Sequence, residues 1–187
     1  MERYGTKHQL MVDLCIHKER GAELGVMLGD SASWYLKELR PRELYLIEPW
    51  RHQDPSEYAS WANADDQAQE GRYRSVLARF GKSTGVRVMR QQAHVVARYL
   101  EPEMFDWVVH DANHKADAVV RDLSAWAALL KIGGIFIVDD VCTRSDLNPA
   151  YYSVPAGIDR FLKMHSGFTA VARSQEDYPS VALKRMS

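Results

Sequence analysis

Three carboxylates follow two apolar runs of the chain, where they could bind a metal ion. Asp111 comes directly after the run Phe105–His110, and Asp139 and Asp140 come directly after the run Ile135–Val138. If the two runs are neighbouring parallel strands, roughly 5 Å apart, these side chains meet at one edge of a sheet. Unpaired carboxylates would repel one another there, and a hard cation such as Mg²⁺ prefers such oxygen ligands. The alternative is that one aspartate caps a helix and another faces solvent.

A histidine lies close to these acids in the sequence. His114 is three residues past Asp111, at or near the start of the next expected helix, and this offset directs its ring toward the same edge. A histidine near its unperturbed pKa of about 6.5 suits a base that works at neutral pH. A surface or capping role is the alternative. His110, one residue before Asp111, alternates to the opposite face of its strand and is expected to be structural.

A turn with two glycines follows the apolar run Ala22–Leu24. Residues 23–31, Glu-Leu-Gly-Val-Met-Leu-Gly-Asp-Ser, allow the backbone to turn tightly and to approach a ligand closely. Ser31 or Ser33 could cap the following helix, whose free N–H groups would accept a carboxylate. The spacing differs from the G-x-G-x-x-G of dinucleotide-binding proteins, which weakens a dehydrogenase interpretation. A plain strand-to-helix turn is the simpler alternative.

An acidic residue ends the next apolar run. Glu48 follows Leu44–Ile47 directly. In nucleoside-binding sheets an acidic side chain at the end of the second strand holds the ribose hydroxyls. Glu48 alone would more often be a surface carboxylate, but its combination with the preceding glycine turn favours a nucleoside ligand.

These residues must be positioned by the alternation of short apolar runs and helical patterns. Helices are expected at Thr6–His17 and at Lys115–Leu130, the second ended by Gly133-Gly134. Strands alternating with helices indicate right-handed crossovers and a parallel sheet covered on both faces. The expected strands are Ala22–Leu24, Leu44–Ile47, Val86–Met89, Phe105–His110 and Ile135–Val138.

The last part of the chain breaks this alternation. Phe168–Arg173 and Val181–Lys184 flank a polar turn without a helix between them, which is typical of an antiparallel hairpin. We therefore predict an α/β fold with a doubly wound, Rossmann-like, mostly parallel sheet, helices on both faces and a C-terminal antiparallel hairpin. Residues 1–187 are expected to form a single domain.

The motifs together resemble class I S-adenosylmethionine-dependent methyltransferases over roughly residues 20 to 165. The subgroup most similar to the sequence is that of small-molecule O-methyltransferases, which includes macrolide-sugar and catechol enzymes. The resemblance implies that the methionine part of S-adenosylmethionine contacts Glu23, Gly25, Gly29 and Ser31, that Glu48 binds the ribose, and that Asp111 also lies in the cofactor site. The turn that would contact adenine, Gln91-Gln92-Ala93, departs from the family's usual polar pair.

The resemblance also implies roles for the acidic cluster. In the metal-dependent subgroup, acidic or amide ligands occupy the places of Asp111, Asp139 and Asp140. The place of His114 carries a histidine or lysine that removes the substrate proton. The sequence thus favours a Mg²⁺-dependent O-methyltransferase acting on a sugar or phenol. A metal-independent O- or N-methyltransferase, a non-catalytic cofactor-binding module and a dehydrogenase remain alternatives.

The composition and charge of the chain limit the kinds of ligand and the cellular location that can be expected. The net charge of −1 disfavours nucleic acid, and Arg72, Arg74 and Arg79 are spaced like a solvated helix face. No apolar run is long enough to span a membrane, and the N-terminal residues lack the apolar core of a signal peptide. The two cysteines do not suggest a disulfide framework. A cytoplasmic enzyme with a small-molecule acceptor is expected.

Two segments could cover the substrate. Trp50 and Trp61 border the segment Arg51–Gln69 and could help shape a pocket. Val141–Gly157 contains Tyr151 and Tyr152, which could line an acceptor site. A second subunit could also close the site, so a homodimer is expected.

Overall fold

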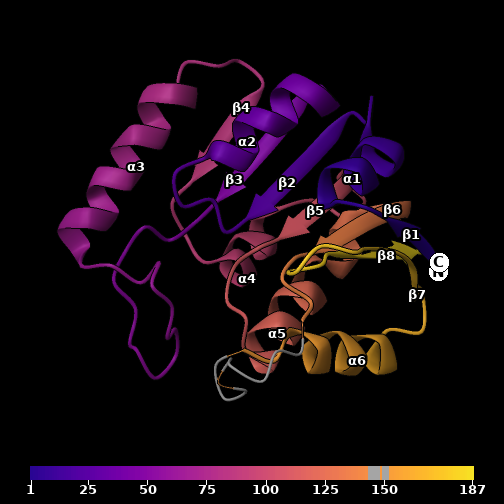
Figure 1. Cartoon of the computed structure of the whole chain (residues 1–187). Helices are drawn as coiled ribbons and strands as arrows, with labels where there is room; N and C mark the ends of the chain where they lie inside the picture. Colours follow the sequence, from indigo (N-terminus) through magenta and orange to yellow (C-terminus); the bar gives the residue numbers. More distant parts are fainter. Residues whose placement is uncertain (143–147, 149–151) are drawn as a thin grey trace.

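The computed structural model describes residues 1–142, 148 and 152–187. Its strands form one twisted sheet in the order β1-β7-β8-β6-β5-β2-β3-β4 (Figure 1). In chain order the strands are β1 (Glu2–Tyr4), β2 (Arg20–Leu24), β3 (Glu43–Ile47), β4 (Val86–Met89), β5 (Phe105–His110), β6 (Leu130–Val138), β7 (Phe168–Ser174) and β8 (Val181–Arg185).

The winding of the sheet reverses between β2 and β5. From β2 the chain adds β3 and then β4 on one side, and then returns to add β5 and β6 on the other, all in parallel. Leu24 at the end of β2 therefore lies beside His110 at the end of β5. His110 in turn lies beside Val138 at the end of β6. The residues that follow these strands must emerge together, which is the usual place for a ligand in a doubly wound sheet.

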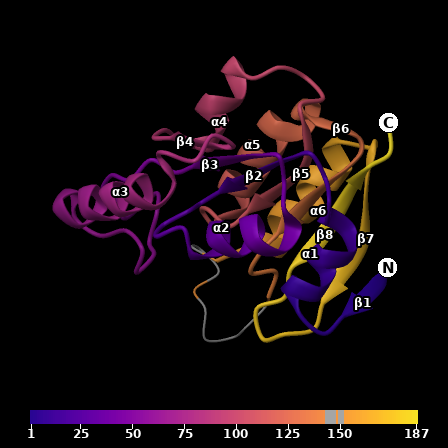
Figure 2. The same cartoon turned by 90° about the horizontal axis from the view of Figure 1, so that it is seen from above.

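Helices cover both faces of the sheet, as the alternating pattern predicts. In Figure 2, α1 and α2 lie on one side of the sheet and α4 on the other. The first face is covered by α1 (Lys7–Cys15), α2 (Asp30–Trp34), the π-helical turn Tyr35–Leu39 and α3 (Asp66–Phe80). The second is covered by α4 (Ala93–Val96), α5 (Ala116–Trp126) and α6 (Val154–Met164), with 3-10 turns at Ala97–Tyr99 and Ala127–Leu129.

The central strand β5 is apolar on both sides because it packs against both helical layers. Trp107 and Val109 are fully buried in the cluster under α1 and α2, whereas Val108 is buried in the cluster under α5. Successive strand residues point to opposite faces, so a doubly covered strand reads as a continuous apolar run. Among the described residues, no helix has the length and apolar composition needed to cross a membrane.

The C-terminal hairpin is confirmed, but it does not form the edge of the sheet. β7 and β8 are antiparallel, and β8 also pairs antiparallel with β6. The short strand β1 then adds in parallel to the outer side of β7. β1 was not expected, because its residues Glu2, Arg3 and Tyr4 contain no apolar run.

The helix expected at Lys115–Leu130 ends earlier in the chain than predicted. α5 ends at Trp126, and β6 already begins at Leu130, so the glycine pair at 133 and 134 belongs to the strand. The pairing of β6 with β5 shifts register between Phe105 and Trp107, and Gly133 adopts a φ of 82°. The two glycines therefore allow an irregular start of β6 and do not end the preceding helix.

A buried carboxylate joins the sheet to two helices on the second face. Asp122 of α5 is 3% exposed and lies 3.6 Å from the His110 ring of β5 and 3.6 Å from the His94 ring of α4. Burial by itself would raise the pKa of Asp122, but the neighbouring His110 and His94 rings and Arg121 outweigh burial and hold the pKa far below its ordinary value. His110 is thus structural, as expected from its position in the strand.

We predict that Asp122→Asn lowers the free energy of unfolding by about 2 kcal/mol at neutral pH, since it leaves buried partners without their anion. The folded-state pKa of Asp122 is depressed, so its contribution is present above the unfolded value of about 4 and is lost as pH falls below it. Urea unfolding of both proteins between neutral and acidic pH tests this. A stability difference that does not shrink with falling pH would contradict it.

Candidate active site

The glycine turn after β2 passes directly over the end of β5. Gly25 has a φ of 92°, and a Cβ atom placed on it would lie 1.9 Å from the carbonyl oxygen of Asp111. Gly29 has a φ of 77° and packs against the ring of Phe80, where a Cβ would lie 2.7 Å away. Both positions lie in the left-handed region that glycine tolerates best. The predicted tight turn is therefore present, and its glycines allow close contact with Asp111 and Phe80.

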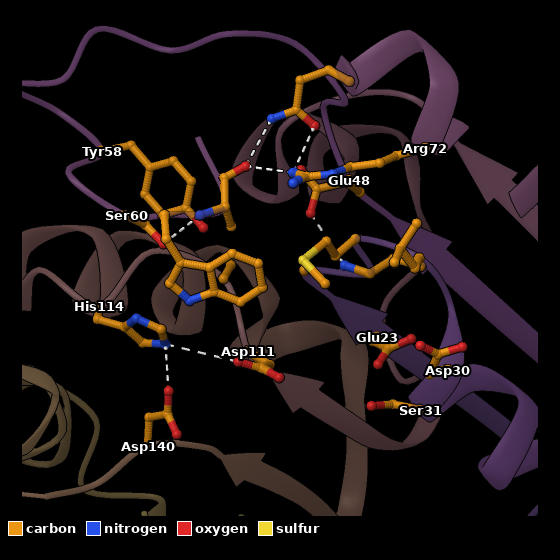
Figure 3. Close-up of a pocket in the computed structure, with 18 residues that line it drawn as sticks. Glu23, Asp30, Ser31, Glu48, Tyr58, Ser60, Arg72, Asp111, His114 and Asp140 are labelled. Carbon is orange, nitrogen blue, oxygen red and sulfur yellow. Dashed lines mark hydrogen bonds and ion pairs between the residues drawn. The ribbon is translucent and has the colours of Figure 1, made fainter. Parts of the chain in front are cut away.

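The turn opens into a cavity of about 290 Å³ at the carboxyl ends of β2, β3 and β5. Figure 3 shows Glu23, Asp30 and Ser31 on one side of it and Asp111, His114 and Asp140 on the other. Most of the expected site residues line this cavity, namely Glu23, Gly25, Ser31, Glu48, Asp111, His114 and Asp140. Gly29 shapes the turn but does not line the cavity. A pocket at the winding reversal is where such sheets bind nucleosides.

One buried and one half-buried carboxylate face this cavity. The Glu23 side chain is 1% exposed, and its Oε2 has no hydrogen-bond partner among the described residues. Burial, reinforced by the negative charge of Asp111, raises the pKa of Glu23 well above its ordinary value. Burial also raises the pKa of Glu48, although the Val26 N–H donates a hydrogen bond of 3.1 Å to its Oε2. Glu23 therefore has a carboxylate oxygen to which a bound ligand could supply a donor or a positive charge.

The residues expected to contact adenine border the same region. Gln92 and Ala93 stand at the start of α4 and line a narrow hollow of about 50 Å³ together with Glu48 and Gly25. Gln92 is the N-cap residue of α4, and its N–H donates to the side chain of Gln91 at 2.9 Å. The structure therefore places the ribose and adenine candidates next to each other.

At the other end of the cavity a histidine lies between two aspartates. The Nε2 atom of His114 lies 3.3 Å from Oδ2 of Asp140 and 3.8 Å from Oδ1 of Asp111. The three side chains can each offer a ligand atom within 4.8 Å of the other two. The ring of His114 also packs against the ring of Tyr152, with 4.8 Å between centroids.

The charges of this group depend on one another. Burial would lower the pKa of His114, but the two carboxylates outweigh it and raise the pKa above its ordinary value. Burial and the negative charge of Asp111 raise the pKa of Asp140. Asp111 shows the opposite net shift, since His114 and the ammonium of Lys7 outweigh its burial and lower its pKa. A cation between the two carboxylates is favoured by this arrangement.

Asp139 is not part of this group, which corrects the expectation of three converging carboxylates. Its side chain forms an ion pair with the ammonium of Lys7 and accepts a hydrogen bond of 2.6 Å from the Ser180 hydroxyl. Asp140 has a φ of 57°, so the chain turns sharply after Asp139 and sends the two successive side chains in different directions. A regular strand end, as assumed from the sequence, does not describe this turn.

The helix cap was also assigned to the wrong residue. Gly29 is the N-cap of α2 and forms no side-chain capping bond, while Ser31 lies inside the helix and Ser33 accepts a bond from Arg79. Both candidate serines are therefore too far along the chain to cap α2, which begins directly at Asp30.

Several residues that line the cavity were not predicted individually from the sequence. Tyr58, Ser60 and Trp61 line the cavity and come from the segment 51–69 that was expected to cover the site. Arg72 lines it too, although its spacing suggested a solvated helix face. Its guanidinium donates to the Ala62 carbonyl at 2.6 Å and so holds the covering segment. Tyr151 lies outside the described residues.

A family model described as a methyltransferase domain matches residues 22–141 of the chain. This span contains the glycine turn, the acid after β3 and both carboxylates of the cluster. The chain therefore belongs to this methyltransferase family, and its sheet and cofactor cavity are those of a class I S-adenosylmethionine-dependent methyltransferase. Among curated proteins, none matches the sequence.

Solved structures with the same fold are distant in sequence. A Staphylococcus aureus protein provisionally named a caffeoyl-CoA O-methyltransferase is 17% identical, with a TM-score of 0.66 over 95% of this chain and 80% of that chain. The Burkholderia thailandensis 1,6-didemethyltoxoflavin-N1-methyltransferase, solved with S-adenosylhomocysteine, is 16% identical, with a TM-score of 0.61 over 96% of this chain and 76% of that chain. A Clostridium thermocellum protein provisionally named an rRNA methylase is 14% identical, with a TM-score of 0.64 over 97% of this chain and 94% of that chain.

We predict that Glu48→Gln weakens the binding of S-adenosylmethionine and of its demethylated product by about 10- to 100-fold, because a charge-assisted hydrogen bond to the ribose is lost. Isothermal titration calorimetry measures both affinities. Glu101→Gln, at an exposed position away from the cavity, is the matched control. Unchanged affinity in Glu48→Gln would show that the ribose is held elsewhere.

Proposed function

We propose that the protein catalyses Mg²⁺-dependent O-methylation of a hydroxylated small molecule, a sugar or a phenol. The observation that carries this proposal is the placement of His114 and Asp140 where two cavities meet. One is the cofactor cavity, and the other has a volume of about 450 Å³. Both residues line both cavities, so they stand between the methyl donor and the space available for an acceptor.

The second cavity suits a small acceptor. Its volume is within the range of small-molecule sites, and its walls combine aromatic side chains with a few polar ones. Tyr58, Trp61, Tyr152 and Tyr178 line it together with His114. Together with the net charge of −1, this supports a small molecule rather than nucleic acid as the partner.

Asp111 and Asp140 fit a hard divalent cation. Their carboxylates lie within 4.8 Å of each other, and the raised pKa of Asp140 reflects a crowding of negative charge that a cation would relieve. Mg²⁺ is commonly bound through one or two carboxylates and retains several waters. When bound, it would supply positive charge that favours the ionised form of the acceptor hydroxyl.

His114 would take the acceptor proton on Nε2. The ionised oxygen then attacks the methyl carbon of the sulfonium, the carbon–sulfur bond breaks, and its electron pair remains on sulfur. Asp140 and Asp111 hold the ring of His114 and stabilise its protonated form, consistent with its raised pKa. Because the donor is already activated, alignment of donor and acceptor is the other main requirement.

A metal-independent O- or N-methyltransferase is the alternative within the family. The observation that favours it is that protonated His114 can itself neutralise Asp111 and Asp140, so the cluster does not require a metal for charge balance. A module that binds the cofactor without catalysis would not need a titratable group between the two cavities.

We further propose that residues 1–187 act as one catalytic domain in the cytoplasm, where the buried thiols of Cys15 and Cys142 stay reduced. We also propose that a second copy of the chain closes the site. The support for a homodimer is Trp61, whose 81% exposed side chain stands at the border of both cavities.

We predict that EDTA depresses methyl transfer from S-adenosylmethionine at least tenfold on an acceptor selected from a panel of phenols and sugars, and that Mg²⁺ restores it. Asp140→Asn should show the same loss without weakening cofactor binding. The measurement is radiolabelled methyl transfer with calorimetry as the binding control. Turnover unaffected by EDTA would leave the metal-independent alternative.

We predict that His114→Gln lowers turnover by about 100- to 1,000-fold at neutral pH, a range typical of losing a general base. The deficit should shrink as pH rises, because more of the acceptor then ionises without help. Rate profiles of both proteins on the same acceptor test this, and calorimetry should find cofactor affinity unchanged. A deficit that is constant across pH would contradict the role of base.

A further inference from the structure

The ion pair of Lys7 with Asp139 lies beside the acidic cluster. Its lysine comes from outside the residues that match the family model. Lys7 begins α1, whereas the matched residues are 22–141. Its ammonium pairs with one carboxylate oxygen of Asp139, and the Ser180 hydroxyl donates to the other. The side chains are 15% and 11% exposed. Both oxygens of Asp139 are therefore engaged within the protein.

Lys7 is held firmly in this place. Its backbone N–H donates to the Glu176 side chain at 2.6 Å, which ties α1 to the turn between β7 and β8. Thr6 and Gln9 close the start of the helix with a reciprocal capping box. Burial would lower the pKa of Lys7, but Tyr35 and Asp139 outweigh it, and the pKa stays well above its ordinary value. The side chain is thus a fixed, charged group.

Without Lys7, Asp139 would stand next to the cluster with a free charge. Its backbone N–H donates to the His110 carbonyl at 3.0 Å, directly beside the strand end that leads to Asp111. The following residue, Asp140, already belongs to the cluster. Lys7, Asp139 and Asp140 also line one hollow of about 240 Å³, so the ammonium borders the space beside the two aspartates.

We propose that Lys7 is a positioning residue that withholds Asp139 from the acidic cluster, so that a divalent cation is bound by Asp111 and Asp140 with only moderate affinity and His114 stays free as a base. This inference rests on the proposed function. A fixed ammonium beside the cluster also opposes a second cation there by direct repulsion. Lys7 thereby limits both the number of ligands and the charge of the site.

The test is to measure Mn²⁺ binding by electron paramagnetic resonance in the absence of any acceptor. Lys7→Met should bind Mn²⁺ at least tenfold more tightly than the wild type, as a third carboxylate becomes free. Lys7→Arg, which keeps the charge, should bind like the wild type. In the double variant Lys7→Met/Asp139→Asn the gain should disappear, because the freed ligand is absent. Crystal structures with Mn²⁺ then count the coordinating carboxylates.

The outcomes separate this inference from the proposed function. If the wild type binds Mn²⁺ and Lys7→Met binds no more tightly, the role of Lys7 is wrong and the metal proposal stands. If only Lys7→Met binds Mn²⁺, the role of Lys7 holds and the metal proposal for the wild type fails. If neither folded protein binds Mn²⁺ at millimolar concentration, both are wrong. Circular dichroism of each variant establishes that it is folded.

Discussion

The contact between the glycine turn and the end of β5 is the constraint on which the site depends. The Asp111 N–H donates to the Leu24 carbonyl at 2.8 Å, and a side chain at position 25 would collide with the Asp111 carbonyl. This contact lies where the winding of the sheet reverses. The same backbone atoms therefore hold both the cofactor turn and Asp111, the first carboxylate of the cluster, in place. A change in either strand end would move both, and methyl transfer depends on their alignment.

The parts of the structure that follow from local patterns could be predicted from the sequence. The central strands are continuous apolar runs because both faces are covered, and the antiparallel hairpin shows in the missing helix between β7 and β8. The glycine turn and Glu48 could be placed in the cofactor cavity because parallel strands end at a common edge. Periodicity and topology were sufficient for these features.

The features that the sequence did not predict depend on contacts between distant segments. β1 is too short and polar to show as a strand and exists through its pairing with β7. Arg72 has the spacing of a surface residue, but the segment before α3 folds back and turns it toward the cavity. Asp139 was expected to act with Asp140, but it is held apart by Lys7, 132 residues earlier, by Ser180 and by the sharp turn at Asp140. Neighbours in sequence therefore acquired different roles through tertiary contacts.

The charge of the cavity ties these contacts to the reaction. Five carboxylates line the cavity, namely Glu23, Asp30, Glu48, Asp111 and Asp140. Arg72 and His114 are the basic residues of the same lining. S-adenosylmethionine brings a sulfonium and an ammonium group, whose positive charges would favour the ionised form of buried acids such as Glu23. Transfer of the methyl group leaves a neutral thioether, so this part of the attraction ends when the reaction does. An acidic lining thus favours the charged donor over its product, and the Lys7 ammonium, paired with Asp139 just behind the cluster, keeps the excess of negative charge moderate.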